Sequence, residues 1–395
     1  MSKWQTARLG DVCEKVTDYV ASGSFASLKE NVLITNEENY AVMVKTADFS
    51  NGFTKGLTYT DKHGYEFLHN SNLFGGELIL SNIGSIGKVF KVPYLDRPMT
   101  LASNSVMIKT ETDELRNYLY YFFLSDIGYE KLMSISSGTS MKKFNKTELK
   151  GLVIPIPPLE TQRQIAANLD KVTHTIDLCN AILEKLDLLV KSRFVEMFGD
   201  LRLNPKGWQV QNFDELSEII TDGEHATPRR TTHGIYLLSA RNVLNHAIQL
   251  EDVDFIDQDE YDRISKRIVP REGDVLVSCS GSVGRCCHVP AGLKFQMVRS
   301  AALIRFKEEI SPLFAEYMIT SDYVQEQIEA AKTASSQANL FQGKIAKLRG
   351  FVPPLELQYQ FAAFVEQTDK SKLAVKQVLE KAETLKKALM QEYFG

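Results

Sequence analysis

The chain has 395 residues, of which 44% are hydrophobic and 24% charged. This composition is typical of a globular protein that buries real cores, and it excludes a disordered or fibrous chain. No run approaches the roughly 18 apolar residues that a membrane helix needs, and no apolar signal segment follows Met1, so we expect a cytoplasmic protein that does not contact membranes. The net charge of −4 excludes a small, uniformly basic DNA-binding protein, although phosphate contact needs only a local basic face.

The five cysteines are odd in number and include no Cys-x-x-Cys pair, which is typical of a reducing compartment where thiols stay free. Cys279, Cys286, Cys287 and His288 lie close together in the sequence. A zinc site there would need a second ligand pair at regular spacing, and we find none. We therefore expect buried or partly buried thiols and no bound metal.

Residues 1–157 have the pattern of a mixed domain. Short apolar runs at 77–81, 88–92 and 106–109 are bounded by Gly, Pro and Ser and predict strands. Residues 116–124 predict a helix. The first domain is therefore expected to be α+β with a β-rich core.

Residues 158–199 predict one long helix. From Glu160 to Phe198 the sequence has no Gly or Pro, and apolar residues recur in steps of three and four from Ile165 to Met197. About forty residues at 1.5 Å each give a helix of roughly 60 Å. An apolar stripe of this length favours pairing with a second helix, and the alternative is a helix that packs only on its own domain.

The sequence then repeats itself after a polar bridge, Asp200 to Gly207. Residues 76–88 match residues 273–285 position by position at an offset of 197, and the Pro-Pro-Leu-Glu-x-Gln motif at 157–162 recurs at 353–358 at an offset of 196. The second domain is therefore expected to span residues 200–353. Strands are again predicted at 274–278 and 302–306, and a helix at 313–320.

Residues 354–395 predict the second long helix, whose apolar seam is weaker. Thr368, Lys372 and Lys386 fall at seam positions, so we expect Leu373 and Leu385 of the adjacent stripe to share in the packing.

Together these elements predict a pseudo-two-fold tandem repeat, in which two α+β domains are separated by two long antiparallel helices. If the first helix leads to the second domain and the second helix returns along it, the domains are held at a fixed separation. Because residues 14–75 share little with residues 218–272, the two domains combine a common scaffold with different loops. This arrangement suits the reading of two DNA half-sites separated by unread bases.

Candidate DNA contacts come from polar loops and local basic patches. The repeated Gly-Ser-x-Gly-Lys/Arg turns do not have the spacing of a Walker A loop, and each lies between two strands, so we expect hairpin turns whose final cation contacts phosphate or guanine. Loops rich in His, Thr and Arg suit base edges, and a lysine cluster near residue 143 suits phosphate, although each residue can also be simply solvated. The predicted contacts are Lys45, Thr46, Ser85, Lys88, Lys142, Lys143, His225, Thr227, Arg229, Arg230, Arg241, Ser282 and Arg285.

Motifs for catalysis are missing from the sequence. We find no Asn-Pro-Pro-aromatic loop, no Gly-x-Ser-x-Gly, no His-Glu-x-x-His, no helicase P-loop and no paired acidic nuclease motif. The chain is therefore expected to have no catalytic, cofactor-binding or metal-binding residues of its own.

In the order in which they occur, these motifs resemble the specificity (S) subunits of type I restriction-modification systems. The resemblance covers essentially the whole chain and rests on the repeated Pro-Pro-Leu-Glu-x-Gln motif, the Gly-Ser-x-Gly turns, the 222–234 loop, the Phe-Gly helix ends and Asn-Pro-Lys-Gly-Trp at 204–208. It implies two target recognition domains, each of which reads half of a bipartite asymmetric site in double-stranded DNA. It also implies two methyltransferase (M) subunits and restriction (R) subunits as partners, which would hold S-adenosylmethionine, ATP and Mg²⁺ and carry out adenine methylation and DNA cleavage.

Two other functions compete with this interpretation. A stand-alone DNA methyltransferase or nuclease requires a cofactor site or an acidic triad, and the sequence contains neither. A coiled-coil adaptor that joins two protein-binding domains would have no affinity for DNA at any salt concentration. Neither alternative explains why two duplicated domains differ in their polar loops.

Overall fold

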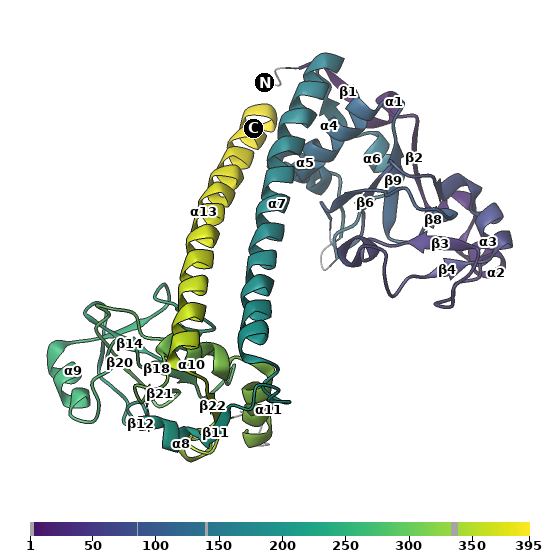
Figure 1. Ribbon diagram of the computed structural model, residues 1–395. Coiled ribbons are helices and arrows are strands. Elements are labelled where there is room, and N and C mark those ends of the chain that lie inside the picture. The colour runs from purple at the N-terminus through teal and green to yellow at the C-terminus, as the bar shows by residue number, and fades with distance from the viewer. Residues whose placement is uncertain (1–3, 85, 139–140, 333–338) are drawn as a thin grey trace. The chain divides into compact units, whose positions relative to one another are not determined.

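The computed structural model describes residues 4–84, 86–138, 141–332 and 339–395. The chain forms two compact units of mixed helices and strands (Figure 1), which confirms the predicted α+β class. Unit 1 contains Met1–Asn180 and Lys376–Gly395, and unit 2 contains Ala181–Val375. In the described part of the chain, no helix is both long enough and apolar enough to span a membrane.

Unit 1 is built on two four-stranded sheets. The first has the order β2-β9-β6-β7 and is antiparallel throughout, whereas the second has the order β4-β3-β8-β5 and contains a parallel pair, β3 and β8. A separate pair, β1 and β10, brings the start of the unit beside its proline-rich block. The strands are β1 (Thr6–Arg8), β2 (Lys15–Asp18), β3 (Ala41–Val44), β4 (Tyr59–Thr60), β5 (Asn72–Leu73), β6 (Leu78–Ser81), β7 (Val89–Lys91), β8 (Met99–Leu101), β9 (Ser105–Lys109) and β10 (Val153–Pro155).

Unit 2 repeats the strand order of the first sheet, but in its second sheet the parallel pair lies at one edge instead of at the centre. Its first sheet, β12-β21-β18-β19, is antiparallel, and its second, β13-β17-β14-β20, again contains one parallel pair, β14 and β20. The strands are β11 (Gln209–Asn212), β12 (Ser217–Asp222), β13 (Arg230–Thr231), β14 (Ile235–Leu238), β15 (Val243–Leu244), β16 (Ala247–Ile248), β17 (Asp254–Ile256), β18 (Val275–Ser278), β19 (Cys286–His288), β20 (Phe295–Met297), β21 (Ala301–Phe306) and β22 (Arg349–Val352). The parallel pairs connect segments that share little sequence, so the fold is more strongly repeated than the sequence.

Short helices cover the sheets of both units. In unit 1 they are α1 (Leu9–Val12), α2 (Phe25–Asn31), α3 (Lys62–Phe67), α4 (Asp113–Leu124), α5 (Asp126–Ser134) and α6 (Lys146–Lys150), with 3-10 turns η1 (Tyr19–Ser22), η2 (Asp48–Asn51) and η3 (His69–Ser71). In unit 2 they are α8 (Phe213–Leu216), α9 (Gln258–Ser265), α10 (Pro312–Ile319), α11 (Asp322–Ala331) and α12 (Gln342–Ile345), with η4 (Ala240–Asn242). Serine caps start α5 and α10, because the Ser125 and Ser311 hydroxyls accept backbone N–H groups that have no partner inside the helix.

Two helices of forty residues, α7 (Leu159–Phe198) and α13 (Leu355–Phe394), confirm the long helices expected from the sequence. The first part of α7 packs in the core of unit 1 through Ile165 and Leu169, together with Phe394 from the end of α13. Figure 1 shows these two segments running side by side in opposite directions within unit 1. The pairing is therefore part of the hydrophobic core of the unit.

In unit 2 the other halves of the same helices pack together. Phe194 and Phe198 of α7 meet Phe361 of α13 at ring-centroid distances of 5.4 and 5.6 Å. Lys372, at a weak seam position, is accommodated because its ammonium lies 2.7 Å from the Asp187 carboxylate. Leu373 and Leu385 are 59% and 49% exposed, so the expectation that they share in the seam was wrong.

Candidate nucleic-acid interface

In unit 2, four loops that are distant in sequence meet around Ser300. The Cys279 N–H donates to the Ser300 carbonyl at 2.7 Å, and the Ala240 N–H donates to the Ser300 hydroxyl at 3.0 Å. Gly223 N–H donates to the Ala301 carbonyl at 3.1 Å. The loop after β12, the start of η4, the β18–β19 turn and the β20–β21 loop therefore form one surface.

Unit 1 brings together the corresponding loops. The Asn82 N–H donates to the Asn104 carbonyl at 3.3 Å, which joins the β6–β7 turn to the β8–β9 loop. The Ala102 N–H donates to the Val44 carbonyl at 3.0 Å, and this hydrogen bond brings the loop after β3 to the same surface. A cavity of about 320 Å³ opens beside this junction, and its polar lining includes Asn82, Ser103, Asn104, Ser137 and Lys143.

The repeated glycine turns are hairpin turns between strands, as the sequence predicted. Gly84 and Gly87 have φ of +76° and +91°, and Gly281 and Gly284 have φ of +69° and +91°, a backbone conformation that favours glycine. At Gly87 a side chain would also meet the Tyr129 ring at 2.5 Å. The positive φ angles, and at Gly87 the Tyr129 ring as well, therefore account for these glycines without a bound ligand.

Three of the predicted contacts in unit 1 are exposed cations, namely Lys88, Lys142 and Lys143. Within the described residues none of them forms an ion pair. Backbone contacts place Lys142 and Lys143 beside the glycine turn. The Gly84 N–H donates to the Lys142 carbonyl at 3.3 Å, and Lys143 forms an antiparallel β-bridge with Ile83. These cations have the exposure that phosphate contact requires.

The other predicted residues of unit 1 lie after β3. The Lys45 ammonium donates to the Thr58 hydroxyl at 2.8 Å and to the Gly56 carbonyl at 3.1 Å, and Thr46 is half-buried beside it. Lys45 is therefore held in place by its own loop. Ser85 lies outside the described residues.

In unit 2 three of the four predicted arginines are paired with aspartates. Arg230 and Arg241 share Asp254, at 2.9 and 3.0 Å from its two oxygens, so the structure brings them together. Arg229 instead pairs with Asp257 at 2.8 Å, beyond the other end of β17. These carboxylates orient the guanidinium groups, which remain about half exposed.

The remaining predicted residues of unit 2 lie on the loops around Ser300. His225 Nε2 lies 2.8 Å from the Asp222 carboxylate, and Thr227 is exposed on the same loop. Ser282 is exposed at the tip of the β18–β19 turn, whereas Arg285 is half-exposed, and its backbone N–H donates to the Ser278 hydroxyl at 2.9 Å.

Sequence reasoning missed Arg299, which is exposed on the β20–β21 loop. Its N–H donates to the Glu224 carbonyl at 3.1 Å, so it lies beside the loop that carries His225. In the described part of unit 2, its side chain forms no ion pair. The loop has no repeated motif, so the only available signal was its position between two apolar strands.

The cysteine cluster is buried in the core of unit 2. Burial raises the pKa of Cys279 to about 12 and raises the pKa values of Cys286 and Cys287 as well, with nearby carboxylates adding to the effect. Thiols of this kind stay protonated at neutral pH, whereas zinc binds the thiolate. Among the residues that the structure describes, no three His, Cys, Asp or Glu side chains are grouped so that they could hold a metal ion.

The sequence matches the family described as "Type I restriction modification DNA specificity domain" over residues 1–188 and 205–384. It is 22% identical to the type I restriction enzyme MjaVIII specificity subunit of Methanocaldococcus jannaschii, covering 98% of this chain and 91% of that protein. It is 20% identical to the EcoKI specificity subunit of Escherichia coli K12, covering 86% of this chain and 77% of that protein.

Two solved structures share the fold. The S subunit of a type I restriction-modification system from M. genitalium superposes with a TM-score of 0.60 at 13% identity, covering 100% of this chain and 96% of that chain. A structure described under the complex assembly and conformational transition of the type I R-M system superposes with a TM-score of 0.56 at 18% identity, covering 99% and 97%. The tandem arrangement of two mixed domains and two long helices is therefore a known architecture.

Proposed function

This chain belongs to the family of type I restriction-modification DNA specificity proteins, and from that premise we propose that its two units read the two halves of one bipartite, asymmetric DNA site. The observation that carries the proposal is the duplicated loop surface. The same loops converge in each unit, yet their side chains differ, with unpaired lysines in unit 1 and aspartate-oriented arginines in unit 2. Two copies of one scaffold with different side chains suit two different base sequences.

The side chains suggest different roles within each surface. Lys88, Lys142 and Lys143 contact phosphates, because unpaired exposed cations bind the DNA backbone without regard to sequence. Arg230 and Arg241 read base edges, because an arginine held by a carboxylate presents its donors in a fixed direction, as bidentate guanine recognition requires.

The chain directs chemistry that other subunits perform. Its sequence contains no catalytic motif, so two M subunits would supply S-adenosylmethionine and methylate adenine, and R subunits would supply ATP- and Mg²⁺-dependent cleavage. The long helices α7 and α13 hold the two reading surfaces in one chain. Their length would set the number of unread bases between the half-sites.

The test is to co-express the chain with the M subunits encoded beside it and to map N6-methyladenine by single-molecule sequencing. We expect one bipartite motif. Arg241→Ala should relax base preference in one half of the motif by about tenfold or more and leave the other half unchanged.

Two outcomes would contradict the proposal. A stable complex without any methylated motif would favour the adaptor function. Methylation of DNA by the purified chain alone with S-adenosylmethionine would show that it is itself an enzyme.

A further inference from the structure

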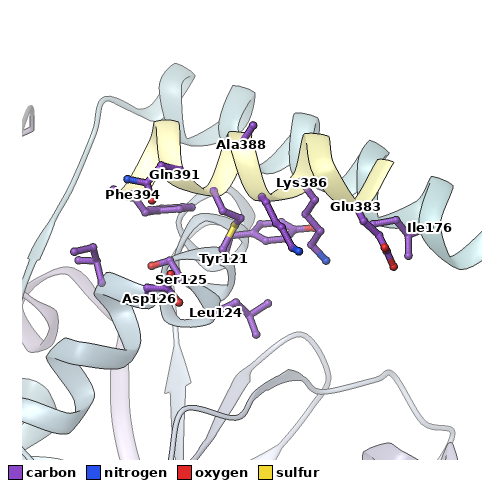
Figure 2. A pocket seen from close by; sticks show the side chains of 14 residues that line it. Tyr121, Leu124, Ser125, Asp126, Ile176, Glu383, Lys386, Ala388, Gln391 and Phe394 are labelled. Carbon is purple, nitrogen blue, oxygen red and sulfur yellow. The ribbon is translucent and has the colours of Figure 1, made fainter. Parts of the chain in front are cut away.

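Unit 1 contains a cavity of about 1130 Å³ at the corner between α4 and α5, below the last turns of α13. Figure 2 shows Phe394 of α13 opposite Ser125 and Asp126 of this corner, with Leu124 at its lower edge. The lining also includes Ile127 and Met390 and is largely apolar. We call this cavity the unit 1 groove.

Unit 2 has the same corner, formed by α10, α11 and the end of α7. Ser125 and Ser321 are the N-caps of α5 and α11, and the two positions differ by 196, as do Phe198 and Phe394. In unit 2 the residues that follow α7 fold back over the corner. Leu201 is only 4% exposed and packs in the core cluster that contains Phe198.

Ion pairs hold this segment of unit 2 in place. Arg202 lies 3.0 Å from the Glu326 carboxylate and 3.9 Å from the Asp322 carboxylate, both on α11. Beyond it, the Trp208 indole N–H donates to the Phe198 carbonyl at 2.8 Å. The corner of unit 2 is thus covered by an aliphatic side chain followed directly by an arginine.

Unit 1 has the same acidic pair without the arginine. Asp126 and Glu130 occupy the positions of Asp322 and Glu326, since 322 − 126 and 326 − 130 both equal 196. Both carboxylates are exposed, and neither forms an ion pair with any residue that the structure describes. Leu124, beside them, is 42% exposed. The groove therefore combines an open apolar surface with the unpaired Asp126 carboxylate, and Glu130 lies one turn further along α5. Its lining also includes the charged residues Glu383, Lys386 and Lys387 of α13.

We propose that the unit 1 groove binds an extended segment of a partner protein in which a bulky aliphatic residue is followed directly by an arginine. The aliphatic side chain packs against Phe394 and Leu124, and the guanidinium pairs with Asp126 and Glu130, as Leu201 and Arg202 do in unit 2. This surface is independent of DNA reading, so the inference goes beyond the proposed function and can fail separately from it.

The first test uses a fluorescein-labelled peptide with the sequence of residues 199–208 and measures its anisotropy with the full-length chain. We expect saturable binding with one peptide per chain, because Leu201 and Arg202 already cover the corresponding corner of unit 2. Replacing the leucine equivalent to Leu201 by aspartate should weaken binding about tenfold or more, since burial of a leucine side chain contributes about 1.5–3 kcal/mol. If the unmodified peptide does not bind, the proposal is wrong.

The second test is a charge swap. Glu130→Lys should lower the affinity for the peptide about threefold. A peptide with glutamate in place of the arginine should recover this lost affinity, but only with the Glu130→Lys chain. Glu184→Lys is the matched control, because Glu184 is exposed on the part of α7 that belongs to unit 2. Equal effects of the two variants would show a non-specific charge effect and overturn the proposal.

The third test locates the bound segment. A peptide that carries photo-leucine at the aliphatic position should cross-link to the groove, near Leu124, Ile127 or Phe394. Cross-links that map mainly to unit 2 would contradict the assignment. Cross-links to a second copy of the chain at a place outside its groove would contradict it as well. The methylation motif of the Glu130→Lys chain should be unchanged, which separates this surface from the DNA-reading surfaces.

Discussion

Asp254 accepts hydrogen bonds from two arginines that we assign to base reading. Its Oδ2 lies 2.9 Å from the Arg230 Nε, and its Oδ1 lies 3.0 Å from an Arg241 terminal nitrogen. The carboxylate limits the directions in which both guanidinium groups can point, and it also offsets part of their positive charge. The two effects act in opposite directions on DNA binding, so a single substitution can separate them.

We predict that Asp254→Asn raises the affinity for non-specific DNA and lowers the ratio of specific to non-specific binding. The loss of one negative charge strengthens phosphate attraction, while the freed arginines discriminate bases less well. The measurement is a titration of specific and random duplexes at several salt concentrations. Asp259→Asn, which removes the same charge from exposed α9, is the control, and equal behaviour of the two variants would refute a positioning role for Asp254.

The site residues show why sequence alone gives only part of the interface. Polar residues between apolar runs identified the loops of His225, Arg241 and Lys143, because loops lie on the surface. The sequence contained no information on which loops meet, since that depends on the parallel pairing of β14 with β20. Arg299 was missed for this reason.

At the scale of elements, strands with a strong local pattern were predicted and those stabilised by distant partners were not. The runs at 77–81 and 302–306 became β6 and β21, because they are buried on both faces and bounded by turn residues. β4 and β13 have two residues each and exist only because a longer strand pairs with them. Leu373 is exposed beside Lys372, which keeps its place at the seam through the ion pair with Asp187. Leu385 is also exposed, but it is distant from this ion pair along the helix.

One polar cluster connects three elements of unit 2. The buried Glu316 of α10 accepts hydrogen bonds from His246, in the β15–β16 turn, and from His288 of β19, whose Nδ1 lies 2.6 Å away. The hydrogen bond to Glu316 raises the pKa of His288 against the opposing effect of burial, and Asp369 of α13 adds to the rise. Burial of Glu316 raises its pKa, but the hydrogen bonds and charges of the two histidines outweigh this and lower it.

We predict that unit 2 becomes less stable as the pH rises from about 6 to 8. A histidine whose folded pKa lies above its unfolded value of 6.5 contributes stability that is present below that value and is lost as the pH rises through the folded pKa. Glu316 contributes stability above its unfolded value, which is lost only in acid, so it does not reverse the trend. The measurement is urea unfolding across this range, followed by hydrogen exchange of unit 2 peptides.

His288→Asn should flatten this pH dependence, because asparagine can donate to Glu316 but does not titrate. His174→Asn, on an exposed position of α7, should leave the dependence unchanged. A slope that survives His288→Asn would assign the effect to other groups around the cluster.

At the scale of the whole molecule, the two ends of the chain contribute to one unit. The last twenty residues belong to unit 1, where Phe394 packs 5.7 Å from the Tyr118 ring and 6.1 Å from the Phe122 ring, centroid to centroid. The Asn168 amide of α7 also donates to the Tyr393 hydroxyl at 2.9 Å. Unit 1 is therefore discontinuous in sequence, whereas unit 2 is one continuous segment.

This asymmetry predicts how the chain responds to truncation. Removal of residues 376–395 should lower the free energy of unfolding of unit 1 by at least about 3–5 kcal/mol, which is the cost of losing one large core aromatic. This loss is expected although the deleted residues are distant in sequence from the rest of unit 1, residues 1–180. Unit 2 should keep its protection, because it spans Ala181–Val375 and contains none of the deleted residues. Hydrogen exchange with mass spectrometry measures both units in one sample.

Single substitutions make this prediction specific. Phe394→Ala should reproduce most of the loss in unit 1, because the ring is only 7% exposed and packs in the core of that unit. Leu385→Ala, on the same helix but 49% exposed, should change stability by no more than about 0.5 kcal/mol. If the truncated chain instead lost protection evenly in both units, the two units would fold as one cooperative body, and the division at residues 180 and 376 would describe geometry without describing stability.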